Sequence, residues 1–158
     1  MAISNSSVIG VNLTRVDSTA QFPVGTIVNL SDSGQAMYVQ ATTSALSTYA
    51  AVSIDANGLA TMLTTTNGAT SPRIGFAQVS IATGAFGWVN LGGTVLVNAA
   101  AQCAPSVPLY TTATPGVLDD AIVSGGYVAG VIITTTISNA TATTAVCQYP
   151  HVAKIGTP

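Results

Sequence analysis

The residues that usually build α-helices are almost absent from this chain. None of its 158 residues is Glu, and Lys and Arg together number only 3. Thr, Val and Ile are frequent instead, and their branched side chains lose conformational freedom in helices but pack well on pleated sheets. The chain is therefore expected to be all-β, and its length fits a single domain over residues 1–158.

Short stretches of alternating apolar and polar residues, separated by turn residues, are typical of β-strands. The expected strands cover residues 7–16, 25–30, 35–40, 49–54, 59–63, 73–81, 86–91, 94–98, 107–112, 127–137 and 143–149. A polar N-terminal arm at 1–7 and a C-terminal tail at 150–158 flank them. We expect a β-sandwich or β-barrel-like fold of short antiparallel strands.

Two short sequences predict tight turns between these strands. In Asp55-Ala56-Asn57-Gly58 the Asn-Gly pair accepts the positive φ angles of a hairpin turn. Gly92-Gly93 predicts a second tight turn, which would make three strands between residues 73 and 98. The only weak helical candidate is 42–48, and no repeat of fixed period is visible.

The low charge of the chain bears on its partners. Charged residues make up 5% of the sequence and the formal net charge is -2. With so few cations, binding to nucleic acid by phosphate neutralisation is not expected. The same scarcity removes the self-repulsion that keeps monomers apart, so we expect permanent assembly, including a homo-oligomer.

The apolar runs, such as 127–133, are much shorter than the ~18 residues of a membrane-spanning helix, so no membrane insertion is expected. The first residues lack the basic and apolar regions of a signal peptide, which predicts synthesis in a cytoplasm. Cys103 and Cys147 have no metal-site or redox spacing and are expected to be buried free thiols. A disulfide between them, formed after release into an oxidising medium, is the alternative.

The sequence contains few residues that could act as catalytic acids or bases, and His151 is the single histidine. Cys147 lies four residues upstream of it, but no nucleophile-elbow sequence G-x-S-x-G occurs. Asp119 and Asp120 are the one adjacent pair of carboxylates, and we interpret them as a solvated pair in a turn. Neighbours on a strand point to opposite faces, so the two would share a metal only if a turn brought them together. We therefore predict no enzyme activity, no cofactor and no metal site.

Phe86 and Trp88 alternate along one predicted strand and share a face. Large aromatic side chains in a small β domain belong more often to the core or to a subunit interface than to a surface. A sugar-binding platform built on Trp88 is the alternative.

The central part of the sequence has a distinctive pattern of glycines and aromatic residues, and residues 74–93 read IGFAQVSIATGAFGWVNLGG. This pattern resembles that of capsid decoration (cement) proteins of tailed bacteriophages. The resemblance continues through VPLYTT at 107–112, PGVLDD at 115–120 and VAGV at 128–131, and covers about half of the chain.

This resemblance implies a non-enzymatic, β-rich subunit of the virion, a trimer or a dimer, that binds the outer surface of the phage head. There it would clamp neighbouring major capsid proteins without a cofactor. A terminal arm, here Ala2 to Ser7, would add a strand to a capsid loop. The expected capsid or subunit contacts are Ala2, Ile3, Val8, Phe86 and Trp88.

A second hypothesis is a phage fibre or adhesin domain. Such a domain would use Trp88 and nearby tyrosines to hold a carbohydrate.

Overall fold

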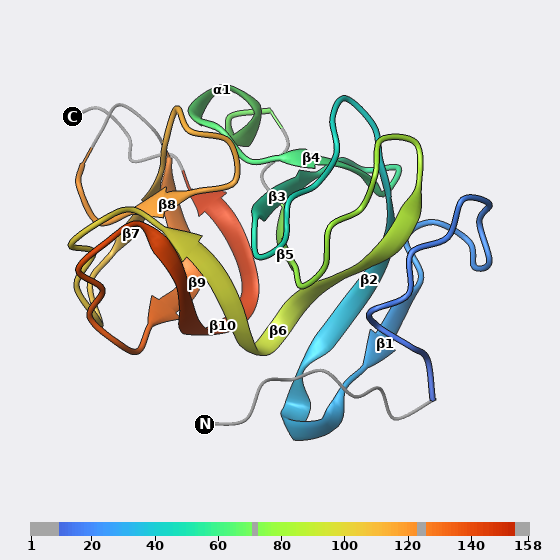
Figure 1. Cartoon of the computed structure of the whole chain (residues 1–158), viewed down its shortest axis with the longest axis horizontal. Coiled ribbons are helices and arrows are strands. Elements are labelled where there is room, and N and C mark those ends of the chain that lie inside the picture. Colours follow the sequence, from blue (N-terminus) through green and yellow to red (C-terminus); the bar gives the residue numbers. More distant parts are fainter. Residues whose placement is uncertain (1–9, 71–72, 123–125, 154–158) are drawn as a thin grey trace.

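The computed structural model describes residues 10–70, 73–122 and 126–153 (Figure 1). It confirms a mostly β fold, in which all the named strands belong to one ten-stranded sheet. The strands are β1 (Ile27–Asn29), β2 (Gln35–Ala41), β3 (Ala51–Ile54), β4 (Leu59–Met62), β5 (Arg73–Ala77), β6 (Phe86–Ala99), β7 (Leu109–Thr111), β8 (Leu118–Asp119), β9 (Tyr127–Ile133) and β10 (Thr141–Ala153). The helical elements are the 3₁₀ turn η1 (Ser31–Ser33) and the short helix α1 (Thr65–Gly68).

The first half of the sheet closes on itself. β2 pairs with β4, β4 with β3, β3 with β5, β5 with β6, and β6 returns to β2. Only the β2–β4 pairing in this ring is parallel. The ring is a small barrel, with β1 added outside it on β2.

The second half forms another ring with the same order of pairings. β6 pairs with β8, β8 with β7, β7 with β9, β9 with β10, and β10 returns to β6. Here too the first and third strands pair in parallel and the others are antiparallel. Gly58 and Gly116, with φ of 78° and 76°, occupy the corresponding turns. The structure thus contains an internal repeat that the sequence does not reveal.

β6 belongs to both rings and joins them. Its first residues pair with β2 and its last with β10, which Figure 1 shows as one long strand between the two halves. Gly92-Gly93 lies inside this strand, so the predicted turn there is wrong. Gly93 instead has a φ of 97°, which lets the strand change direction without ending.

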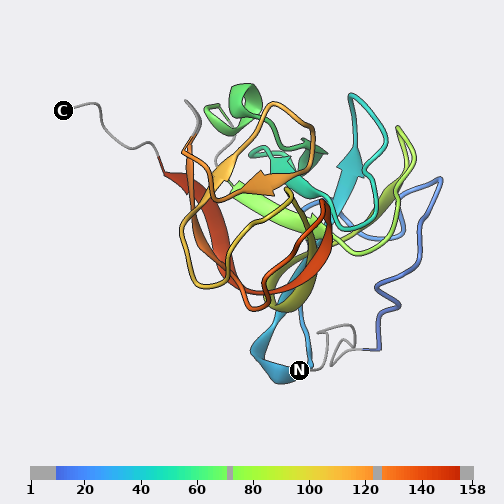
Figure 2. The same ribbon diagram turned by 60° about the vertical axis from the view of Figure 1, so that its left-hand side comes forward.

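Each ring encloses apolar side chains. The interior of the first ring holds Met37, Val39, Ala41, Leu46, Val52, Ile54, Ala60, Ala77, Ile81, Val89 and Leu91. The second holds, among others, Val95, Val97, Cys103, Leu109, Leu118, Val128, Val131, Ile133, Ala145 and Cys147. α1 lies at the upper end of the molecule and the β1–β2 hairpin at the lower end in two views (Figures 1 and 2).

Other predicted elements need correction at their ends. Residues 10–16 form no strand, because the Asn12 side chain accepts from the Thr14 backbone N–H at 3.0 Å and makes a local turn. Residues 1–9, and with them the predicted arm, lie outside the described residues. β10 continues through Pro150 to Ala153, so the tail does not begin at 150.

The predicted helix at 42–48 is absent, and helix α1 follows it instead. α1 begins at a reciprocal cap, in which Asn67 N donates to the Thr64 hydroxyl and Thr64 N donates to the Asn67 side chain. In the predicted hairpin turn only Gly58 has a positive φ, so Asn57 does not contribute as expected. No helix in the described part of the chain is long and apolar enough to cross a membrane.

Candidate functional site

A groove of about 830 Å³ opens between the first ring and the last part of β10. Its floor is apolar and includes Met37, Ile54 and Leu91, all buried and all from the interior of the first ring. Polar side chains stand around it: Arg73, Tyr149, His151 and Asp55. The groove is therefore an opening into a barrel core with a polar rim.

A bulge in β10 places two of these rim residues. Between the pairs Cys147–Val131 and His151–Ala129, one residue of β9, Gly130, faces three residues of β10. Pro150 lacks the N–H of a regular ladder, and Gly130 has a φ of 77°. The bulge turns β10 away from β6, and His151 becomes the pairing partner of Arg73 on β5.

The groups on the rim are not joined into a catalytic relay. His151 Nδ1 lies 3.1 Å from the Tyr149 carbonyl oxygen, and the Tyr149 hydroxyl bonds to the Gln35 side chain. The Asp55 carboxylate accepts from the backbone N–H groups of Asn57 and Leu59, each at 2.8 Å, and so holds the hairpin turn. The groove offers features of binding rather than a nucleophile with a base.

Arg73 is the exposed cation of the groove. Its Nη1 lies 4.0 Å from the Met37 sulfur, and it forms no ion pair within the described residues. The other described cation, Arg15, is paired with Asp17. Arg73 thus keeps its guanidinium available to a negatively charged group.

The predicted aromatic candidates lie in the chain's own packing. Trp88 is 2% exposed, and Phe86 is half-buried. Tyr38 lies 5.1 Å from Trp88 between ring centres, and Phe22 packs edge-on against both. Trp88 is therefore a core residue and presents no platform to a sugar. The other contact candidates, Ala2, Ile3 and Val8, lie outside the described residues.

The buried Tyr38 is anchored at its polar end. Its hydroxyl donates to the Asp17 carboxylate at 2.8 Å. Burial, more than any neighbouring charge, raises the pKa of Tyr38 above its usual value. These contacts fix the segment before β1 against the first ring.

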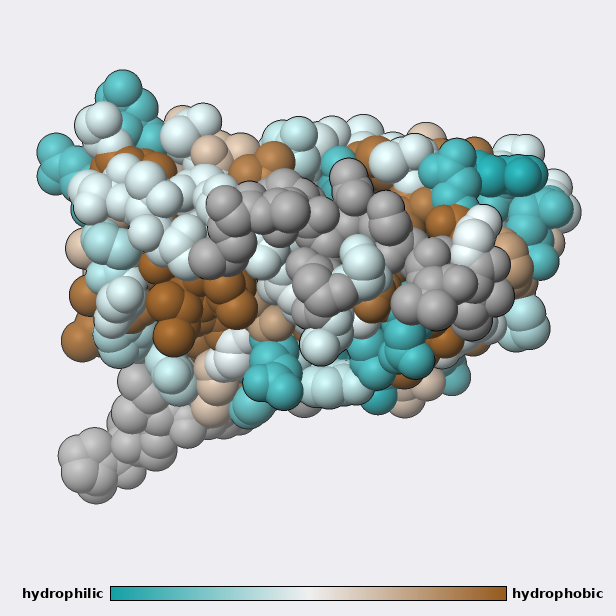
Figure 3. Space-filling model, turned by 90° about the horizontal axis from the view of Figure 1, so that it is seen from below, coloured by the Kyte–Doolittle hydropathy of each residue, from teal (hydrophilic) through white to brown (hydrophobic). Residues whose placement is uncertain are grey.

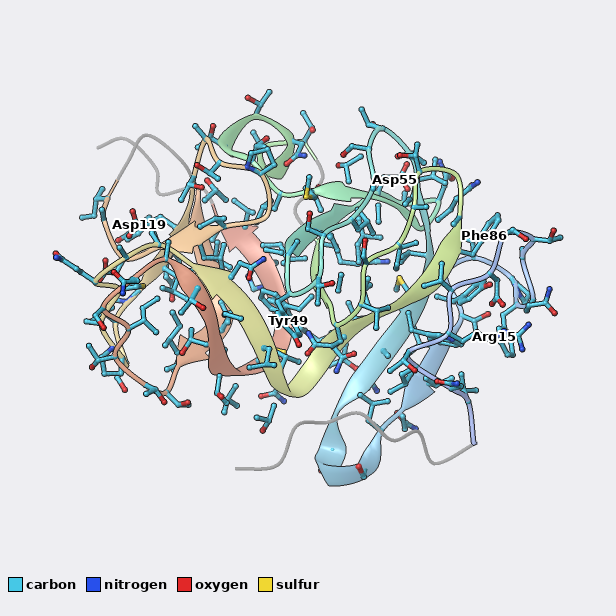
Figure 4. All side chains as sticks on the ribbon, viewed as in Figure 1. Arg15, Tyr49, Asp55, Phe86 and Asp119 are labelled. Atoms are coloured by element: carbon cyan, nitrogen blue, oxygen red, sulfur yellow. The ribbon has the colours of Figure 1, made fainter. Side chains whose placement is uncertain are left out.

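Asp119 and Asp120 lie beside the Cys103 thiol, where the chain bends at the end of β8. One ligand atom from each of these three residues lies within 4.8 Å of the others. β8 ends at Asp119, and the bend after it brings Asp120 round to accept from Ala104 N at 2.8 Å. Figure 4 shows Asp119 on the second ring, far from Asp55 on the first.

The chemistry of this second cluster favours a structural role. Burial and the nearby Asp120 carboxylate raise the pKa of the Cys103 thiol to about 11, which favours the neutral thiol beside the two carboxylates. Cys147 is likewise a buried free thiol, as the sequence indicated. It faces the second core cluster while His151 is exposed on the groove, so these two do not form a pair.

Comparison with known proteins adds no relative. No protein-family model matches the chain, and no curated protein matches it.

Proposed function

We propose that this chain is a capsid decoration protein, which binds the outer surface of a tailed-phage head and stabilises the lattice of the major capsid protein. Its mechanism is mass action, because a subunit that binds the assembled shell but not the separated capsid proteins favours the shell. Because one head offers many equivalent sites, the stabilisation of the shell grows with the number of subunits bound. The resemblance of residues 74–131 to decoration proteins supports the proposal.

The observation that carries the proposal is an exposed apolar pair on the outside of the second ring. Ile132 and Val146 are 51% and 42% exposed, and they are direct partners across β9 and β10. Figure 3 shows an apolar area over this half of the molecule. With so little charge in the chain, such a surface fits lasting contact with another protein.

Sedimentation with undecorated expanded heads tests the proposal. We expect the purified chain to pellet with heads at micromolar concentration and to stay in solution without them. Val146→Asp should weaken binding, while Val16→Asp, at another exposed valine, 39% exposed, should not. Absence of the wild-type chain from the pellet would contradict the proposal.

The N-terminal contacts need a separate variant. A chain that lacks residues 2–8 removes Ala2, Ile3 and Val8, the expected arm contacts. We expect it to fold, as circular dichroism would show, and to pellet with heads less than the full chain does.

A further inference from the structure

β1 presents an unpaired edge beside the groove. The hydrogen bonds from Tyr38 N to Thr26 O and from Leu30 N to Gly34 O, both 2.8 Å, fix which pairs of the β1–β2 ladder are bonded. By alternation, the backbone N–H and C=O groups of Ile27 and Asn29 point away from β2. Within the described residues no other strand pairs with β1. This edge can therefore accept an added strand.

The face of β1 that carries Ile27 is the face of the groove. Ile27 is 47% exposed, lines the groove, and stands opposite Met37, which lies on the groove floor. Directly opposite residues of paired strands point to the same side. A segment added to β1 would therefore direct every second side chain over the apolar floor.

Arg73 gives this groove a charge preference. Its guanidinium reaches the Met37 sulfur, so it lies over the same part of the floor. Asp55, the carboxylate of the groove, is held by the backbone of its own turn. A carboxylate from outside would find an available cation at the rim.

We propose that β1 and the groove bind an extended segment of a partner protein that carries an apolar residue and an acidic residue two positions apart. The segment adds a strand to the outer edge of β1. Its apolar side chain packs on Met37, Ile54 and Leu91, and its carboxylate pairs with Arg73. This goes beyond attachment to a head, since it describes a site that the free protein already contains.

Matched peptides test the chemistry of the site on the free, full-length protein. The probe is acetyl-Thr-Leu-Thr-Glu-Thr-amide, and its controls replace Glu by Gln or Leu by Ala. By calorimetry or amide shift titration, we expect the Glu peptide to bind about three- to fivefold tighter than the Gln peptide. Replacement of Leu should weaken binding at least as much, because the apolar contact is lost.

Variants of the protein distinguish the contribution of the Arg73 charge to peptide binding from that of the β1 edge. In Arg73→Gln the preference for Glu over Gln should disappear, whereas Arg15→Gln should keep it because Arg15 faces Asp17. Asn29→Pro removes an outward N–H together with the side-chain oxygen that accepts from Gln35 Nε2 at 3.0 Å, so Asn29→Ala is its matched control. Relative to Asn29→Ala, Asn29→Pro should weaken all three peptides by about fivefold. Circular dichroism and thermal unfolding check that each variant folds.

Three results would overturn the proposal: equal affinity for the Glu and Gln peptides, unchanged binding by Asn29→Pro, or no binding of any peptide at millimolar concentration. A dimer of the free protein that Asn29→Pro dissociates would also overturn it, since a second copy would then occupy the edge. Sedimentation of Arg73→Gln with heads is a separate measurement, because it tests attachment to heads and not peptide binding in the groove. Loss of the peptide preference with normal pelleting would keep both proposals.

Discussion

Buried thiols are the residues whose chemistry the fold changes most. Burial raises the pKa of the Cys147 thiol from 9.0 to about 12, and burial with the Asp120 charge raises that of Cys103 to about 11. Each folded-state pKa lies above the unfolded one, because the folded protein favours the neutral thiol. The stability that comes from keeping these thiols neutral is therefore fully present below about pH 9. It is lost as pH rises through the folded values.

Above pH 9 the protein should therefore lose stability. Between its unfolded and folded pKa values, the Cys147 thiol lowers the free energy of unfolding by about 1.4 kcal/mol per pH unit. Cys147→Ala should give a shallower decline in urea unfolding between pH 9 and 11 than the wild type. Parallel declines would show that Cys147 does not contribute.

Among the elements, β6 was the hardest to predict from the sequence. Its two halves were found as strands from their alternation, but Gly-Gly signals a turn and a close backbone approach equally. Tertiary pairing decides between them, because Gly92 pairs with Gln35 of β2 and with Gln148 of β10, which keeps this segment inside the strand. The β3–β4 hairpin was predicted because its turn depends on local residues alone.

The positive φ of Gly93 inside β6 gives a prediction for this element. Gly93→Ala should lower the free energy of unfolding by about 1–3 kcal/mol, since an L side chain disfavours its φ of 97° inside a paired strand. Gly84→Ala is the control, because Gly84 has a φ of 80° but lies in an open turn. We expect a smaller loss there, of about 1 kcal/mol. A loss at Gly93 no larger than at Gly84 would contradict this account of β6.

The whole molecule consists of two rings that cannot separate, because one strand belongs to both. The all-β class followed from composition, but the repeat did not, since the rings share an order of pairings rather than a residue pattern. The groove was also beyond sequence reasoning, because Arg73 and His151 meet only through the bulge in β10. The sequence predicts a tail at His151, and no motif in it distinguishes Arg73.

The shared strand predicts a single unfolding transition. Trp88 fluorescence reports on the first ring, and labelling of Cys103 and Cys147 reports on the core of the second. In urea the two signals should change together. Thiol labelling that precedes the fluorescence change would mean that the rings unfold independently.

Electron cryomicroscopy of expanded heads, with and without the purified chain, tests the proposed attachment to heads most directly. We predict additional density at equivalent positions over the outer surface of the heads, with a size that fits the two-ring molecule. Bare heads in the presence of excess folded chain would contradict the account.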